Sequence, residues 1–232
     1  MRKKYVTPAI IIFSIIEIIL LGFVLFGISP YRRYCSYGTV CLSFAFSLCF
    51  ISYKNKNYLI QFALFFTIIA DFYLVLLKSD EKLIAMISFS IAQIFYAAEI
   101  HKKTIKEKPR KIFLYFRIFA ILIAEFLCFV VLKNKVDFLS LISLFYFANL
   151  LITTAQAFYN FKHSKLFAIG LLLFILCDIV IGLQGLFTMY FDLNSNLLIY
   201  KIIFSRYNLA WHFYVPSQTL IAITAAVQLK KK

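Results

Sequence analysis

Long polar stretches are missing from this sequence of 232 residues, and acidic residues are few, at 10 against 25 Lys and Arg. Glycine and proline are also scarce, at 6 and 4 residues. Without a polar segment of domain size, a separate soluble domain is excluded. What is abundant is hydrophobic residues, 63% of the chain with 28 Phe, in runs separated by short charged breaks. This pattern predicts a polytopic membrane protein with a single integral-membrane domain over residues 1–232.

The N-terminus, the cysteines and the net charge each have a simple explanation in a membrane protein. The first apolar run is too long for a signal peptide and lacks a small-residue cleavage site. Five cysteines lie in or beside apolar runs without C-x-x-C spacing, which is typical of packing. The net charge of +15 comes from Lys and Arg in the breaks, where they set orientation and contact anionic headgroups. We expect membrane lipids and no nucleic acid as partners, and no cofactor.

Eight apolar runs approach the ~20 residues that a helix needs to cross the hydrocarbon, which predicts an all-α bundle of about eight transmembrane helices. With both termini on one side, the loops on that side contain 16 Lys and Arg and the opposite loops contain 8. This excess predicts that both termini are cytoplasmic. We expect an integral protein of the cell membrane of a bacterium. The predicted spans are 7–28, 35–52, 58–77, 82–100, 111–132, 137–160, 165–188 and 207–228.

Four acidic residues fall inside the predicted spans, where a carboxyl group costs about 2.5 to 3.5 kcal/mol to insert and marks a functional site by default. Each lies about 10 to 14 residues from the predicted cytoplasmic end of its helix, which at ~1.5 Å per residue gives a common depth of roughly 15 to 21 Å. We interpret this layer as the lining of a shared cavity. The four acids are Glu17, Asp71, Glu125 and Asp178.

Neutral polar side chains recur on the other helices at three- and four-residue steps, so each set forms one stripe along its helix. Such amides and hydroxyls often join membrane helices by hydrogen bonds, and that structural role is the alternative for each of them. Their convergence with the acids favours a binding site. The candidate substrate-binding residues are Gln93, Tyr96, Asn149, Gln156, Tyr214 and Gln218, together with Glu17 and Glu125.

Four stretches, in the same order over most of the chain, resemble the YhhN-like membrane lysoplasmalogenases. They are Ala70-Asp71-Phe72-Tyr73-Leu74, Phe89…Gln93…Tyr96, Gly170…Phe174…Cys177-Asp178 and Tyr214…Gln218…Leu220-Ile221. The family pattern often has His at the place of Gln93 and Ser at that of Cys177, so this chain departs from it there. The resemblance implies cleavage of the vinyl-ether bond of a lysoplasmalogen, a lysophospholipid, to a fatty aldehyde and a glycerophospho-base.

This chemistry needs an acid and a carboxylate. Protonation of the vinyl-ether β-carbon gives an oxocarbenium ion, water captures the ion, and the resulting hemiacetal collapses to aldehyde and alcohol. Burial favours the neutral form of one carboxyl group as proton donor, while an ionised partner stabilises the cation and activates water, as in glycosidases. We predict Asp71 and Asp178 as the catalytic pair, with either one as the acid. A basic rim residue such as Lys78 would meet the phosphate.

Other chemistries have less support. The three histidines show neither H-E-x-x-H nor H-x-x-x-H spacing, so no metal site is expected, and G-x-S-x-G is absent. The main alternative is a proton-coupled transporter or lipid-binding protein. Two helix pairs, 58–77 with 82–100 and 165–188 with 207–228, repeat an acid helix before a Tyr/Gln helix, as a duplicated transporter would. A pocket closed toward one face favours the enzyme, and a path to both faces favours transport.

Overall fold

Helices account for all the regular structure in the described part of the chain. The computed structural model describes residues 2–27, 31–50, 58–77, 81–104, 106–133, 136–189, 198–204 and 209–230. The helices are α1 (Arg2–Phe26), α2 (Tyr31–Cys49), α3 (Leu59–Asp71), the π-helix η1 (Phe72–Leu77), α4 (Lys82–Lys103), α5 (Glu107–Leu132), α6 (Phe138–Tyr159), α7 (Phe161–Met189), α8 (Leu198–Ile203) and α9 (Leu209–Lys230).

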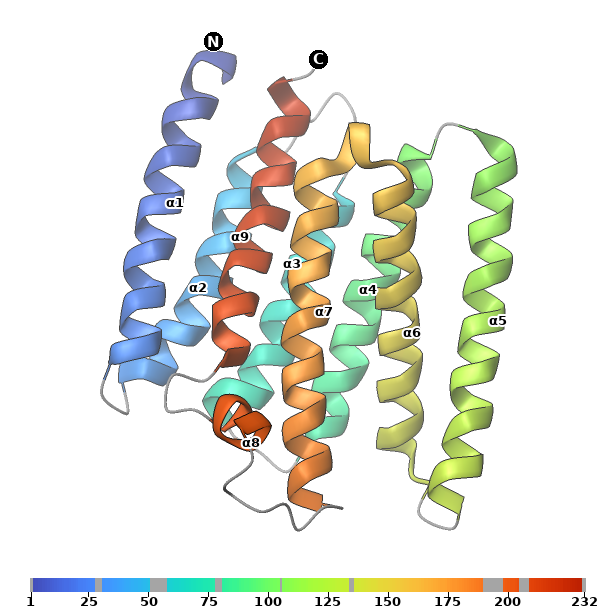
Figure 1. The fold of residues 1–232 in the computed structure, drawn as a ribbon. Helices are drawn as coiled ribbons and strands as arrows, with labels where there is room; N and C mark the ends of the chain where they lie inside the picture. Colours follow the sequence, from blue (N-terminus) through green and yellow to red (C-terminus); the bar gives the residue numbers. More distant parts are fainter. Residues whose placement is uncertain are drawn as a thin grey trace.

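The predicted all-α bundle is confirmed. The described residues form eight long helices that run along the bundle, with α3 and η1 counted as one, and the short α8 lies at one end (Figure 1). Several helices begin before the apolar run that predicted them, as α5 does at Glu107. Within the described ranges, six helices are long and apolar enough to cross a membrane: Tyr5–Phe26, Leu59–Leu77, Lys82–Lys103, Glu107–Val131, Phe138–Tyr159 and Phe161–Gly185.

The start of α1 and the end of α9 lie at the same end of the bundle, here called the terminal end (Figure 1). Helices α3, α4, α7 and α9 form its centre, where α7 packs closely on α9 and α3 on α4. Helices α1 and α5 lie at opposite edges (Figure 1). Side chains on the central helices are therefore the ones that can meet inside the bundle.

Glycine allows α7 and α9 to approach closely. A Cβ added at Gly170 would lie 2.9 Å from the side chain of Ile221 and 3.2 Å from the carbonyl oxygen of Ser217. Small residues favour such close helix packing in membranes. The tight contact fixes the rotation of α9, and with it the side chains that α9 directs toward α3.

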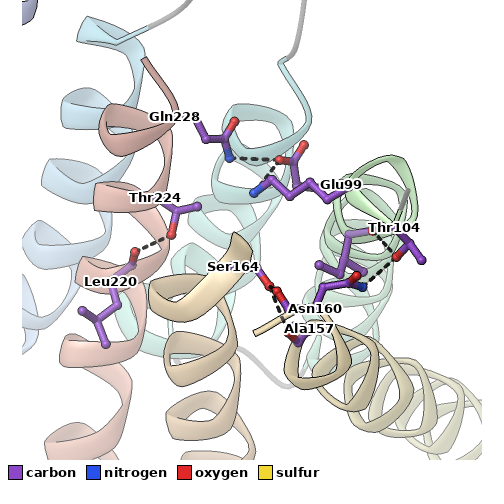
Figure 2. Close-up of polar contacts among 10 residues, drawn as sticks. Glu99, Thr104, Ala157, Asn160, Ser164, Leu220, Thr224 and Gln228 are labelled. Carbon is purple, nitrogen blue, oxygen red and sulfur yellow. Dashed lines mark hydrogen bonds and ion pairs between the residues drawn. The ribbon is translucent and has the colours of Figure 1, made fainter. Parts of the chain in front are cut away.

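A buried acid joins α4 to α9 near the terminal end (Figure 2). Glu99 is fully buried, accepts a hydrogen bond of 3.0 Å from Gln228 Nε2 and forms a 3.0 Å ion pair with Lys103. The Lys103 ammonium also lies 5.4 Å from the centre of the Phe167 ring on α7. These contacts tie three central helices together.

Hydroxyl and amide groups also fix the corner between α6 and α7 (Figure 2). Ser164 has a non-helical backbone there and donates to the carbonyl oxygens of Ala157 and Asn160, at 2.9 and 2.8 Å. Asn160 in turn donates to Thr104 Oγ1 at 2.8 Å, beyond the end of α4. The corner is therefore bonded to α4 at the terminal end.

Candidate active site

A cavity of about 670 Å³ lies between η1, α4, α6, α7 and α9. It is lined by residues near the starts of α4, α6 and α9 and by the last turns of α7, which places it in the half of the bundle away from the terminal end (Figure 1). Both central aspartates, Asp71 and Asp178, line it. The cavity expected between these two acids is thus present.

Asp71 is the last residue of α3, where the α-helix passes into the π-helix η1. Short π-helical segments inside α-helices are frequent at functional sites. The Asp71 side chain is 3% exposed, and its Oδ2 accepts a hydrogen bond from the hydroxyl of Tyr214 on α9. The carboxyl group is therefore held by a helix distant in sequence.

Asp178 has an equivalent partner on a different helix. The Tyr146 hydroxyl on α6 donates to Asp178 Oδ2 at 2.5 Å. Tyr146 is 5% exposed and lines the same cavity. The site thus contains two aspartate–tyrosine pairs, contributed by four helices.

Aromatic rings support both tyrosines. The Phe174 ring centre lies 6.4 Å from that of Tyr146 and 5.6 Å from that of Tyr214, so one side chain packs against both pairs. Phe89 packs against Tyr146 at 5.7 Å, and Trp211 against Tyr214 at 5.5 Å. Such contacts restrict ring rotation and fix the position of each hydroxyl.

Apart from the acids and tyrosines, the cavity walls are mostly apolar, and part of the lining belongs to the outer surface of the bundle. Leu74, Ile179 and Ile181 line the cavity and are 38%, 42% and 52% exposed. The cavity therefore borders the apolar surface that a membrane protein presents to lipid. A hydrocarbon chain can enter there without leaving an apolar environment.

Three predicted binding residues lie close to the cavity but are not part of its lining. Gln93, Tyr96 and Gln218 are fully buried on α4 and α9. The amide atoms of both glutamines have no hydrogen-bond partner among the described residues. Tyr214, by contrast, reaches the cavity as predicted.

Asn149 and Gln156 make structural hydrogen bonds instead of reaching the cavity. Asn149 Oδ1 accepts a bond of 3.0 Å from the Arg117 guanidinium on α5. Gln156 Nε2 donates to Thr104 Oγ1 at 3.0 Å near the terminal end. The interhelical role that the sequence left open is the one these two side chains have.

Glu17 and Glu125 lie away from the aspartates, so the interpretation of one cavity shared by all four acids is wrong. Glu17 is buried on α1 and accepts a 3.1 Å hydrogen bond from Ser43 on α2. Glu125 lies on α5, which packs on α6. Because α1 and α5 form opposite edges of the bundle, neither glutamate lines the cavity (Figure 1). Lys78 lies outside the described residues.

Tyr146 lines the cavity and bonds Asp178, but it was not among the predicted site residues. It begins the polar stripe on α6 that continues to Asn149, so a signal was present. What the sequence does not reveal is that the start of this stripe faces α7 and Asp178, whereas Asn149 faces α5. In the described ranges, no three His, Cys, Asp or Glu side chains gather as metal ligands would.

Comparison with known proteins supplies the family. The model of the YhhN family matches residues 33–225. No curated protein and no solved structure matches the chain. The matched region includes both aspartates and both tyrosines of the cavity.

Proposed function

We propose that this chain, which belongs to the YhhN family, is a membrane-embedded hydrolase that cleaves the vinyl-ether bond of a lysoplasmalogen or a related lysolipid. The observation that carries the proposal is the pair of aspartates lining one cavity, each hydrogen-bonded to its own tyrosine. Paired carboxyl groups are what acid-catalysed cleavage of an ether-type bond requires.

The shape and walls of the cavity suit a single-chain lipid. Its volume of about 670 Å³ falls within the roughly 300 to 1,000 Å³ of small-molecule sites. Its opening beside Leu74, Ile179 and Ile181 would admit the hydrocarbon chain from the membrane. The acids inside would then meet the polar end of that chain, where the vinyl ether lies.

The first step is transfer of a proton from one aspartic acid to the β-carbon of the vinyl ether. The double-bond electrons form the new C–H bond, and the ether oxygen shares the positive charge that develops on the α-carbon. The other aspartate, ionised, stabilises this oxocarbenium ion. Asp71 and Asp178 fill these two roles, with either one as the acid.

The second step is capture of the ion by water. The water oxygen bonds to the α-carbon while its proton passes to the ionised carboxylate, and a hemiacetal forms. The hemiacetal collapses when its hydroxyl proton passes to the carboxylate that gave up the first proton, while the newly protonated aspartic acid protonates the departing glycerol oxygen, which leaves as an alcohol. The products are a fatty aldehyde and a glycerophospho-base, and the proton balance needs no cofactor.

The two tyrosines act as positioning residues for the acids. Each hydroxyl occupies Oδ2 of its aspartate and thereby leaves Oδ1 to exchange protons with substrate or water. Phe174 packs on both rings and holds the two aspartate–tyrosine pairs in fixed positions relative to each other. Prepositioned groups of this kind avoid reorganisation during the reaction.

Packing beyond the cavity favours hydrolysis over transport. The aspartates open to one half of the bundle, while toward the terminal end the interior is occupied by fully buried side chains, among them Tyr96, Phe167 and Ile221. A transporter needs a path that reaches both faces in turn. A hydrolase needs only to admit a lipid to the cavity and release its products.

The direct experiment offers the detergent-solubilised protein a panel of lysolipids that differ only in the linkage of the chain: ester, alkyl ether or vinyl ether. Free aldehyde is expected from the vinyl ether alone, because only its double bond can accept a proton at carbon. Release of fatty acid from the ester without aldehyde from the vinyl ether would replace the proposal with an esterase.

A further inference from the structure

Two glutamines in the centre of the bundle are buried in an unusual way. Gln93 on α4 and Gln218 on α9 are both 0% exposed. The nitrogen and the oxygen of each amide have no hydrogen-bond partner among the described residues. Buried amides in proteins nearly always have such partners, from protein or from ordered water.

Their position follows from the helices that carry them. Phe89 and Tyr214 line the cavity, and Gln93 and Gln218 follow them by four residues, on the same faces of α4 and α9. Both helices run toward the terminal end (Figure 1). The two amides therefore lie about 6 Å further toward that end than the cavity wall, at one shared level.

A third polar group belongs to this level. Thr67 precedes Asp71 by four residues on α3, which runs the opposite way, so it too lies one turn beyond the cavity toward the terminal end. Thr67 is fully buried, and its hydroxyl donates to the carbonyl oxygen of Ala63. Its oxygen has two lone pairs, so it can accept a hydrogen bond from water as well as contact the buried Tyr96 hydroxyl. Three helices thus direct polar groups to the layer directly behind the acids.

We propose that Gln93, Gln218 and Thr67 form a binding site for internal water behind the aspartate pair. A buried water makes about three hydrogen bonds and accumulates where several polar groups lack partners. Two amides supply donors and acceptors, and the threonine supplies a further acceptor. The site takes water rather than substrate, because none of the three residues lines the cavity that would hold the lipid.

The site gives the second step of the reaction its nucleophile, and this part of the inference rests on the proposed function. A cavity filled by a hydrocarbon chain contains little water of its own. Water held one helical turn behind Asp71 and Tyr214 can reach the oxocarbenium carbon while the lipid still occupies the cavity. Gln93 and Gln218 are then positioning residues for the hydrolytic water.

A double-mutant cycle on melting temperature tests the site without any assay of activity. Methionine matches glutamine in size, so Gln93→Met or Gln218→Met removes one amide and leaves the other with fewer water-mediated bonds. The double variant leaves no amide unsatisfied. We expect each single variant to lower the melting temperature of the full chain, and the double variant to melt no lower than the less stable single variant.

A matched control is available in Gln61 on α3. Gln61 is buried, but its Nε2 donates directly to the carbonyl oxygen of Ser47 at 3.1 Å. Gln61→Met and Gln218→Met share no water, so their effects should add. Additive shifts for Gln93 and Gln218 as well would overturn the shared site, as would failure of the singles and the double to fold. Recovery of folding only in the double variant supports it.

The role of the water is tested by competition with methanol. Methanol can add to the oxocarbenium carbon and pass its proton to the carboxylate, which gives a mixed acetal in place of the aldehyde. We expect the ratio of acetal to aldehyde to rise severalfold in Gln93→Met/Gln218→Met relative to wild type and Gln61→Met. An unchanged ratio would overturn the role in hydrolysis. If wild type released no aldehyde but the melting shifts of Gln93→Met and Gln218→Met were still non-additive, the proposed function would be wrong and the water site would stand.

Discussion

The hydroxyl of Tyr214 donates a hydrogen bond to Oδ2 of Asp71, a residue 143 positions earlier in the chain. This bond joins α9 to the point where α3 becomes a π-helix. A second bond, from Tyr146 to Asp178, joins α6 to α7 on the same cavity. The geometry of the acids therefore depends on two hydrogen bonds, and each can be removed by deleting one hydroxyl oxygen.

Replacing either tyrosine by phenylalanine removes that oxygen and keeps the ring. A hydrogen bond to a charged group contributes about 1.5 to 3 kcal/mol, which corresponds to roughly a tenfold to hundredfold loss of kcat/KM. We expect this loss in both Tyr146→Phe and Tyr214→Phe, measured as aldehyde release from a vinyl-ether lysolipid. Tyr115→Phe is the control, since Tyr115 is 68% exposed on α5. Full activity in both cavity variants would contradict the positioning role.

The close approach of α7 and α9 predicts an unusual response to alanine. Gly170→Ala places a methyl group 2.9 Å from the Ile221 side chain, and overpacking of this kind costs about 1 to 3 kcal/mol. We expect a lower melting temperature, and a smaller drop when Gly170→Ala is made in an Ile221→Ala background, because alanine lacks the Cγ1 atom that the added methyl group would meet. Gly22→Ala on α1 is the control, because nothing lies within 4 Å of its added Cβ. Equal melting temperatures for the two alanine variants would mean that the helices are further apart.

The contact between Arg117 and Asn149 predicts a stability effect without a binding effect. Asn149→Leu leaves the guanidinium with Thr153 as its acceptor among the described residues, and loss of a partner for a partly buried charge is destabilising. We expect a loss of about 1 to 3 kcal/mol, partly recovered in Arg117→Leu/Asn149→Leu. KM for the vinyl-ether lysolipid should stay within about twofold of wild type, because Asn149 does not line the cavity. A large rise in KM at unchanged stability would contradict this and show that Asn149 contributes to substrate binding.

Orientation can be measured with reporter fusions in bacterial cells. The charge of the loops predicts cytoplasmic termini. Alkaline phosphatase fused to the C-terminus should therefore be inactive, and a green fluorescent protein at the same place should fluoresce. Phosphatase fused after Lys133, at the far end of α5, is the control and should be active (Figure 1). Active phosphatase at the C-terminus would mean that the termini lie outside the cytoplasm and that the cavity lies in the cytoplasmic half of the membrane.

The sequence predicted the bundle and the two aspartates for a clear physical reason. Apolar runs of membrane length identify helices by themselves, and an acid within such a run is conspicuous because its insertion is costly. Depth along a helix can also be read from residue numbers, which placed all four acids in one layer, and the family resemblance singled out Asp71 and Asp178 among them. These predictions depend on local properties of single helices.

The lateral position of a helix in the bundle is not a local property, and the predictions that depended on it were wrong. Glu17 and Glu125 match the aspartates in expected depth, yet α1 and α5 lie at the edges of the bundle (Figure 1). Asn149 and Tyr146 belong to one stripe but face different neighbours, because the helix turns about 100° per residue and α6 has α5 on one side and α7 on the other. Only the packing of the helices assigns each polar side chain to a cavity or to a partner.

The most direct test compares aldehyde release from a vinyl-ether lysolipid by wild type, Asp71→Asn and Asp178→Asn, with Glu17→Gln as the matched control. Asparagine keeps the shape of each side chain and removes its proton chemistry, so each aspartate variant should lose about 10²- to 10⁴-fold in rate while remaining folded. Glu17→Gln should retain the wild-type rate, since Glu17 bonds Ser43 away from the cavity. Wild-type turnover by both folded aspartate variants would contradict catalysis by the pair.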